Sequence, residues 1–417
     1  MANVFVVTDL VAKESLRIAH EKLAMIGTVD RQYDAEFKLH GRASPHGSTL
    51  RVKSPNRYTR RVGQAMEVQN QNEVAQTITV ATLNGVDMGF NHQELMQSVD
   101  NDGAFDDLSK NYIQPAIAGM CSGIEADAIA FWTKATYNVA GTAGTALTDL
   151  VAVGSARAKL NQNAAPKDGN RYIQADSVTM GGMVNGLKGL FQDSQQIKEQ
   201  YREGMLGRTA MADWYENDRM WSMTNGNDVT GTTDAAAQVT DGGSTVDVAD
   251  TITTTTVGSV FTIAGVYAVH PETKAALPNL QQFVVTANAS GVLTVSPKTY
   301  LGLSATTAAL RNVAKSDGTA LALTDFNSAT TTWVGAASTS YVQSLMYHKE
   351  AFQFVTAPLP ILDDAQKCVV VTKDNLSLRC WMGSDIRNNE LLMRIDILYG
   401  MAALRPEWAS RIIGAAS

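Results

Sequence analysis

Residues 226–345 differ so strongly in composition from the rest of the chain that they limit the folds it can adopt. This stretch of 120 residues holds 23 threonines and 12 charged residues, whereas 63 of the other 297 residues are charged. Its short apolar runs alternate with Gly, Pro, Asn and Asp, which is typical of strands separated by turns. We predict a small all-β domain inserted into a loop of a larger body. A threonine-rich low-complexity segment is the alternative.

Two long amphipathic helices are predicted before this insertion. Apolar residues recur at steps of three and four over 9–26 and over 104–137, which places them on one face of each helix. Gly27 suits the turn that ends the first helix, and Pro115 is expected to bend or restart the second helix after its first turns. The apolar stripe of the first helix must pack on something, and we expect a neighbouring copy to cover it.

The rest of the chain predicts a discontinuous α+β body. Residues 148–222 alternate helix and strand, with a helix capped by Thr148 and a strand over 171–180. Over 390–400, apolar residues at every second position alternate with Arg394 and Asp396, which predicts a strand after the insertion; the apolar residues are Leu391, Met393, Ile395, Ile397 and Tyr399. The body therefore receives its last strands from the C-terminal part of the chain.

A basic segment lies between the two predicted helices. From Lys38 to Arg61 the chain has seven Lys or Arg residues and no acid, and Gly and Pro break up regular structure over 30–85. Two strands with a loose tip fit this pattern, and such an arm cannot bury itself alone. Acids gather at the start of the helix over 104–137, so we expect the arm of one copy to dock on the acidic patch of another. The candidate inter-subunit residues are Arg57, Arg60 and Arg61 on the arm, with Asp102, Asp106 and Asp107 on the patch.

Composition argues against several classes of protein. The formal net charge is −7, whereas proteins that grip DNA over a large surface are usually basic. The sequence has no run of about 18 apolar residues, so we predict no membrane span. It also has no basic leader, so we predict no secretory signal. Three cysteines give neither a disulfide framework nor a Cys-x-x-Cys metal pair. We expect synthesis in the cytosol and no membrane partner.

Three motifs imitate catalytic or binding sites and fail on detail. Gly181–Gly189 lacks the Lys-Ser/Thr ending of a nucleotide-binding loop. Gly119–Gly123 imitates a nucleophile elbow around Cys121 but lies inside a helical pattern. A calcium loop around Gly103 would lack its closing Glu. We therefore predict no catalytic residue, no cofactor and no metal site.

Taken in order, these segments resemble the major capsid (coat) proteins of tailed double-stranded DNA bacteriophages, in the subfamily with an inserted β-rich domain. Three stretches carry the resemblance: Tyr201–Gly204 continuing through Arg208, Ala351–Pro360, and Arg394–Gly400 with Ala403 and Arg405–Glu407. The resemblance implies the Hong Kong ninety-seven type of fold, which has an N-terminal arm, an extended loop, a spine helix, and peripheral and axial domains. On this chain it implies an N-terminal arm helix over 1–29, an extended loop over 30–90, a peripheral domain with spine helix over 91–140, an axial domain over 141–225, the insertion over 226–345, and return strands over 346–417.

The resemblance also implies a function. It implies an icosahedral shell of hexamers and pentamers in the virion, assembled in the host cytoplasm around a scaffolding protein. Double-stranded DNA would enter through a portal protein and lie against the inner face without sequence-specific binding. The shell of a bacterial cargo-enclosing nanocompartment is the alternative, and an α/β enzyme is a weaker one.

Overall fold

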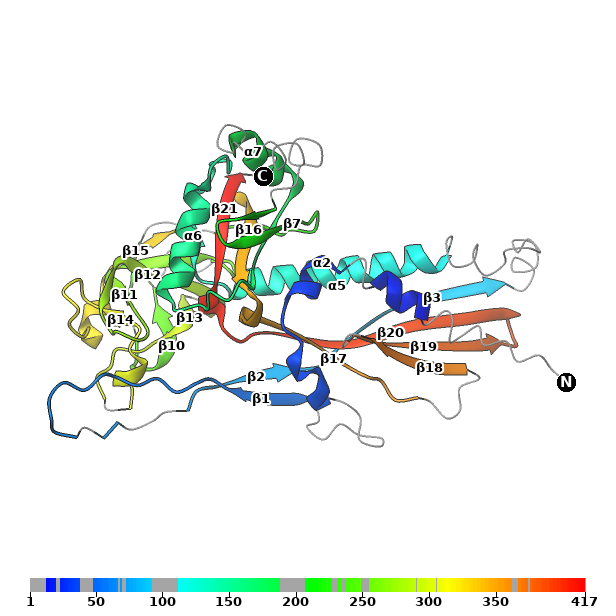
Figure 1. Cartoon of the computed structure of the whole chain (residues 1–417), viewed down its shortest axis with the longest axis horizontal. Helices are drawn as coiled ribbons and strands as arrows, with labels where there is room; N and C mark the ends of the chain where they lie inside the picture. Colours follow the sequence, from blue (N-terminus) through cyan, green and yellow to red (C-terminus); the bar gives the residue numbers. More distant parts are fainter. Residues whose placement is uncertain are drawn as a thin grey trace. The chain divides into compact units, whose positions relative to one another are not determined.

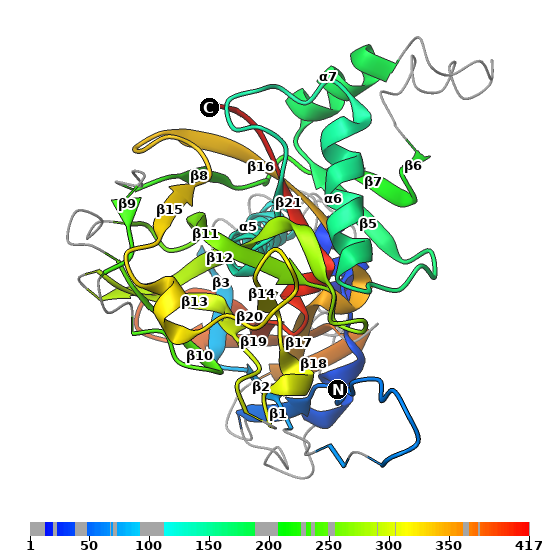
Figure 2. The ribbon, with the colours of Figure 1, turned by 90° about the vertical axis from the view of Figure 1, so that its left-hand side faces the viewer.

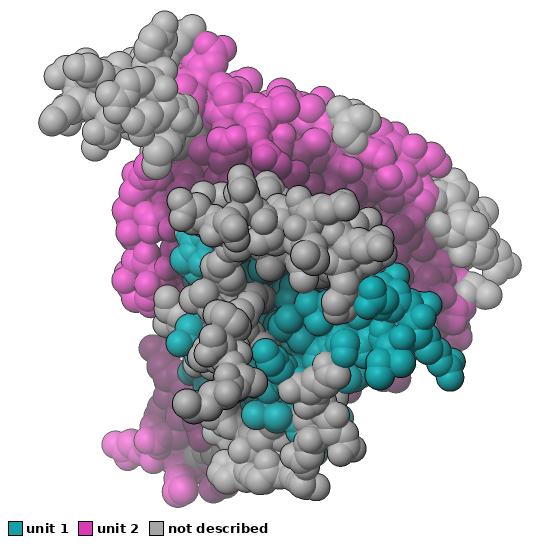
Figure 3. Space-filling model, turned by 90° about the vertical axis from the view of Figure 1, so that its right-hand side faces the viewer, with its two compact units in different colours: residues 1–52, 77–128, 353–402 teal, residues 53–76, 129–352, 403–417 magenta. Residues whose placement is uncertain are grey.

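The computed structural model describes residues 13–19, 23–37, 48–66, 68–69, 73–91, 112–187, 207–226, 231–234, 238–248, 255–289, 291–304, 306–361, 367–373 and 376–416. The chain divides into two compact units, which Figure 3 colours separately. The first comprises Met1–Val52, Thr77–Ala128 and Gln353–Ala402, and the second comprises Lys53–Gln76, Ile129–Phe352 and Ala403–Ser417. Each unit is therefore assembled from segments that lie far apart in the sequence.

A five-stranded sheet forms the frame of the first unit. Its order is β17 (Phe352–Ala357), β20 (Glu390–Ala403), β19 (Leu376–Asp385) and β18 (Lys367–Lys373), and β3 (Thr82–Asn91) also pairs with β20. Figure 1 shows β18, β19 and β20 running side by side. The strand predicted over 390–400 is confirmed, and its apolar positions from Met393 to Tyr399 are buried. Asp396 breaks the predicted alternation because its side chain is also buried.

The helix α5 (Gln114–Ala135) is shorter in the described residues than the predicted helix over 104–137. The part before residue 112 lies outside the described residues. Pro115 is the second residue of α5 and follows the π-helical residues 112–113 closely, so the α-helix starts at this proline, in agreement with the predicted restart. Trp132 of α5 is buried, whereas the neighbouring Phe131 is 42% exposed.

The N-terminal apolar stripe is buried within the chain itself. Residues 13–19 are helical, and α2 (Ala24–Thr28) follows after a break. Leu16, Ala19 and Ile26 are each at most 2% exposed. The expectation that a neighbouring copy must cover this stripe is therefore wrong for these residues. Gly27 lies inside α2 without a left-handed backbone angle, so its predicted role as a terminator is also wrong.

A mixed seven-stranded sheet forms the body of the second unit. Its order is β4 (Val139–Ala140), β21 (Ala409–Ala416), β16 (Ser340–His348), β5 (Arg171–Ala175), β7 (Ala212–Glu216) and β6 (Arg208–Thr209), with β8 (Ser222–Thr224) paired to β16. The helix α6 (Leu150–Gln162) packs on it through Val153, Ala156 and Leu160.

Two local predictions for this body are corrected by the structure. Asp149, not Thr148, caps α6 by accepting the N–H of Val151. The strand predicted over 171–180 ends at Ala175, and α7 (Ser177–Leu187) begins two residues later. Helix α7 takes up the first part of the glycine-rich segment that starts at Gly181, so this segment does not form a strand-to-helix loop.

A second seven-stranded sheet is built from residues between β8 and β16. Its order is β10 (Gly243–Asp247), β13 (Val292–Thr299), β12 (Ala276–Ala289), β11 (Val260–Val269), β15 (Thr330–Trp333) and β9 (Gly231–Thr232), with β14 (Val313–Ala314) paired to β11. A bridge between Thr233 and Val248 joins the two ends of this order. The sheet has its own apolar core, which includes Phe261, Phe283 and Trp333. Figure 2 shows β11, β12 and β13 lying together.

The predicted arm is a two-stranded hairpin. Strands β1 (Thr49–Lys53) and β2 (Ala75–Thr79) pair with each other, and the division between the two units passes through them. The remaining short elements are the 3₁₀ turns Gln32–Phe37, Ala308–Leu310, Leu323–Phe326, Lys349–Ala351 and Pro406–Trp408.

Candidate functional site

The described residues hold no group of three or more His, Cys, Asp and Glu side chains arranged to bind a metal ion. No helix among them is long and apolar enough to cross a membrane. Cys121 is buried inside α5 and not on a strained turn, so the geometry of a nucleophile elbow is absent there. The acidic turn around Gly103 lies outside the described residues. The features that stand out are instead the arm and the junction between the two sheets of the second unit.

Contacts between the two sides of the arm hold these sides next to each other. Lys53 and Glu73 form an exposed ion pair at 2.6 Å. Beyond it, the side chain of Gln69 accepts the N–H of Thr59 at 2.8 Å and donates to the carbonyl of Thr59 at 2.6 Å. These contacts continue the pairing past the ends of β1 and β2, so the tip extends as a two-sided loop.

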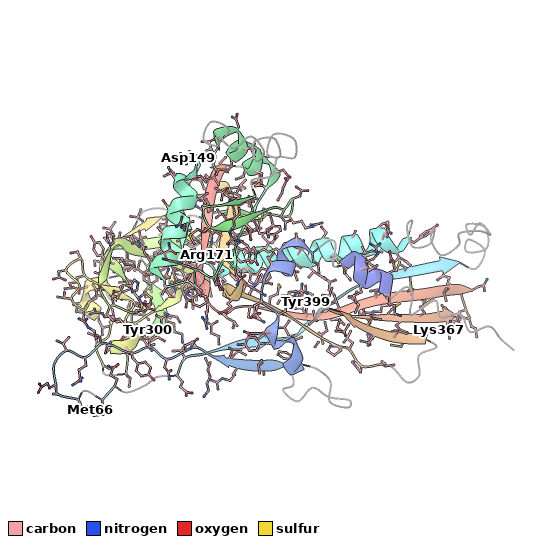
Figure 4. All side chains as sticks on the ribbon, viewed as in Figure 1. Met66, Asp149, Arg171, Tyr300, Lys367 and Tyr399 are labelled. Carbon is pink, nitrogen blue, oxygen red and sulfur yellow. The ribbon has the colours of Figure 1, made fainter. Side chains whose placement is uncertain are left out.

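The tip of the arm exposes apolar side chains that sequence reasoning did not single out. Tyr58, Val62, Met66 and Val68 are 56%, 81%, 84% and 78% exposed. Met66 lies on the loop at the end of the arm (Figure 4). Isolated exposed apolar residues are common, and these four are notable because they lie on one short loop. Their spacing in a segment without regular structure gave no periodic signal.

The predicted contact residues fall into two groups. Arg60 and Arg61 are exposed on the arm, and Arg61 donates to the carbonyl of Ala65 at 2.5 Å. Arg57 lies 3.7 Å from Glu407 of the same chain. The acidic partners Asp102, Asp106 and Asp107 lie outside the described residues, so their pairing with the arm stays a prediction.

The Glu407 carboxylate has an environment that favours its neutral form. Burial raises the pKa of Glu407, whereas the nearby Arg57 and Arg405 lower it. Arg405 is engaged elsewhere, since it lies 3.6 Å from Glu350 and stacks over the Trp408 ring at 4.1 Å. Among the described residues, Arg57 is thus the cation that pairs directly with Glu407.

A buried arginine joins the inserted sheet to the body. Arg411 on β21 is 1% exposed and donates to the carbonyls of Thr136 at 2.8 Å, Gly258 at 2.7 Å and Lys134 at 3.3 Å. Two of these carbonyls lie at the end of α5, where the helix dipole favours a positive charge. No carboxylate of the described residues pairs with it, and burial lowers the pKa of Arg411 to about 9.

A second cation, which is partly buried, lies at the same junction. Lys159 on α6 donates to the carbonyl of Val139 and to the side-chain oxygen of Gln282 on β12. Gln282 also accepts the N–H of Val139 at 2.8 Å. Burial lowers the pKa of Lys159 to about 8. Both cations bond neutral oxygen atoms, so each ties the inserted strands to the body without a salt bridge.

Comparison with known proteins identifies the family. The model of the family described as P22 coat protein, gene protein 5, matches residues 62–414. No curated protein sequence matches the chain.

The solved structures that match the chain include one from Mycobacterium phage Che8, with 10% identity over 94% of this chain and 90% of that chain and a TM-score of 0.49. The capsid of Ralstonia phage GP4 has 8% identity over 94% and 87% and a TM-score of 0.46. The virus-like particle from Pyrococcus furiosus has 7% identity over 97% and 98% and a TM-score of 0.41. Since the family model covers most of its 417 residues, this chain belongs to the P22 coat protein family and is a structural protein of a phage shell.

Proposed function

We propose that this chain is the major capsid protein that assembles with itself into an icosahedral shell of hexamers and pentamers. The shell forms first as a procapsid around a scaffolding protein in the host cytoplasm. It then becomes the mature head of the virion, with double-stranded DNA packaged through a portal protein. The family match over residues 62–414 is the observation that carries this proposal.

We infer a Hong Kong ninety-seven type layout with an inserted all-β domain. The hairpin β1–β2 corresponds to the extended loop over 30–90, and α5 to the spine helix of the peripheral domain over 91–140. The sheet that runs from β9 to β15 corresponds to the insertion over 226–345. Its support is a separate apolar core and the Thr233–Val248 bridge, which makes the strand order circular and therefore barrel-like. The remaining ranges are the N-terminal arm helix over 1–29, the axial domain over 141–225 and the return strands over 346–417.

The arm is the proposed contact with a neighbouring copy. Arg60 and Arg61 would meet an acidic patch that includes Asp102, Asp106 and Asp107. An exposed ion pair contributes about 0–1 kcal/mol, whereas burying one large apolar side chain contributes about 1.5–3 kcal/mol. The exposed apolar residues at the tip would therefore supply most of the affinity, and the arginines would set orientation and register.

The inner face is proposed to meet DNA without binding its sequence. The chain carries a net charge of −7, so it lacks the excess of Lys and Arg with which proteins neutralise phosphates. A wall of this charge would let packaged DNA move along it. Cation contacts with DNA, if they form, would be local and few.

Electron microscopy of particles made by co-expression with the phage scaffolding protein tests the proposal. We expect closed shells from the wild-type chain. The variant Arg60→Glu/Arg61→Glu should give fewer shells while the subunit keeps its unfolding midpoint. Lys298→Glu/Lys367→Glu reverses the same charge at two exposed positions away from the arm and serves as the matched control.

The outcomes separate the proposals. Normal shell yield from the arginine variant would contradict the arm contact alone. Small soluble oligomers under every condition would contradict the shell function. Shells that enclose a protein cargo and never DNA in infected cells would favour a nanocompartment.

A further inference from the structure

We propose that the arm is latched onto its own subunit by the Arg57–Glu407 contact, and that this latch must open before the arm can reach a neighbouring copy. The inference rests on the proposed shell function, which gives the arm an external partner. The two residues lie 3.7 Å apart within the second unit. Arg57 belongs to the arm, and Glu407 belongs to the 3₁₀ turn Pro406–Trp408 that precedes β21.

The turn that carries Glu407 is fixed from several sides. The N–H of Arg405 donates to the carbonyl of Ala351 at 3.1 Å, and the carbonyl of Glu407 accepts from the Asn138 side chain at 3.3 Å. The Trp408 indole donates to the carbonyl of Asn163 at 3.2 Å. These hydrogen bonds hold the turn that carries Glu407 in place, whereas Arg57 belongs to an extended loop. Loss of their contact would free the arm and leave the turn in place.

The charges around the contact make it weak enough to open. Glu407 is faced by Arg57 from the arm, by Arg405 from its own turn and by the Tyr137 hydroxyl from the segment after α5. Arg57 also faces Lys274 and Tyr300: burial and then the Arg57 charge lower the pKa of Lys274, whereas burial and Asp241 raise the pKa of Tyr300 against the effect of Arg57. The Arg57 guanidinium therefore lies near a second cation as well as near Glu407. A partly exposed ion pair of this kind changes the ratio of docked to released arms by a few-fold and not by orders of magnitude.

The latch has a defined pH dependence. Burial raises the pKa of Glu407, while the guanidinium of Arg57 favours the ionised carboxylate. Docking of the arm and ionisation of Glu407 therefore assist each other. Protonation of Glu407 removes its attraction to the Arg57 guanidinium, so the arm is expected to be released as the carboxylate becomes neutral at low pH.

Distance measurement by paired spin labels tests the latch in the full chain. Labels at Val62→Cys on the arm and Leu303→Cys on the inserted segment occupy exposed positions, and Cys368→Ser removes the partly exposed native thiol. Glu407→Gln should increase the ratio of released to docked arms by about twofold to fivefold and abolish its pH dependence. Glu73→Gln, which breaks the exposed pair with Lys53 but leaves Glu407 intact, is the matched control. The charge exchange Arg57→Glu/Glu407→Arg should restore docking that each single reversal reduces.

Identical distance distributions in the wild-type chain and Glu407→Gln at every pH would overturn the latch. Shell growth with the scaffolding protein is a separate readout. If Glu407→Gln frees the arm and shells grow faster, both proposals are supported. If the arm is freed and no variant forms shells, the shell function fails and the latch stands.

Discussion

Arg411 offers a quantitative test of how the inserted sheet is joined to the body. Replacing Arg411 with Met keeps a long apolar stem but removes the donor from the carbonyls of Lys134, Thr136 and Gly258. Hydrogen bonds from a charged donor contribute about 1.5–3 kcal/mol each, and two of these three are shorter than 3 Å. Burial of a guanidinium without a carboxylate offsets part of this gain, which its lowered pKa reflects. We expect Arg411→Met to lower the free energy of unfolding by about 2–4 kcal/mol.

Urea unfolding of the purified subunit measures this change. Tryptophan fluorescence reports on the inserted sheet through Trp333 and on the end of α5 through Trp132, and circular dichroism reports on the whole chain. Arg208→Met, which removes an exposed pair with Asp213, is the matched control and should cost at most about 1 kcal/mol. An unchanged midpoint and slope for Arg411→Met would refute the reasoning, because the three carbonyls would then need no buried donor.

Three further predictions concern single sites in the second unit. Gly186→Ala should lower the free energy of unfolding by about 1–3 kcal/mol, because a Cβ there would lie 1.6 Å from the carbonyl oxygen of Thr148. The control is Gly181→Ala in the same helix, where a Cβ would have no atom within 4 Å; thermal melting should show this variant to be neutral or stabilised. Lys159→Met should remove a rise in stability between about pH 8 and pH 10, since the unfolded chain binds this proton more tightly than the folded one; an equal pH slope in both proteins would contradict the assignment. Asp241→Asn should speed amide hydrogen exchange at Leu301 and Leu303, whose N–H groups its carboxylate accepts at 2.8 and 3.1 Å, and unchanged exchange there would show that other contacts hold the loop.

Patterns that depend on local periodicity were predictable. The strand over 390–400 and the apolar face of α5 follow from the spacing of side chains, because burial of one face imposes that spacing. Asp396 could not be predicted as buried from this spacing. Its carboxylate is stabilised by Arg394 at 2.6 Å on the same strand and by Arg379 at 2.7 Å on β19, and the second pairing requires β19 and β20 to be in register.

The ends of elements were less predictable than their existence. The strand predicted over 171–180 extends past Ala175, yet the chain changes from strand to helix where Asp176 and Ser177 follow. Likewise Thr148 and Asp149 are both good caps by residue type, and only the backbone geometry selects Asp149. Neighbouring residues compete on nearly equal terms at such points, and tertiary packing decides between them.

The arm illustrates the same limit for function. Its basic residues were visible in the sequence, whereas the exposure of Val62 and Met66 and the approach of Arg57 to Glu407 were not. Contacts between residues some 350 positions apart leave no local pattern, because each partner alone resembles an ordinary surface residue.

By itself, the sequence determined which kind of segment each stretch forms: a basic hairpin, a long helix, a body and a threonine-rich β segment. Each segment has the side-chain periodicity or the composition that its exposure to solvent requires. Only the tertiary structure decided how these parts are joined. The N-terminal stripe proved to be covered within its own chain, and the buried Arg411 and the partly buried Lys159 proved to join the strands between β8 and β16 to the rest of the second unit. These contacts depend on the free energy of burying a cation among carbonyl oxygens from distant segments of the chain. The sequence does not reveal them, because those oxygens surround the cation only after the chain has folded.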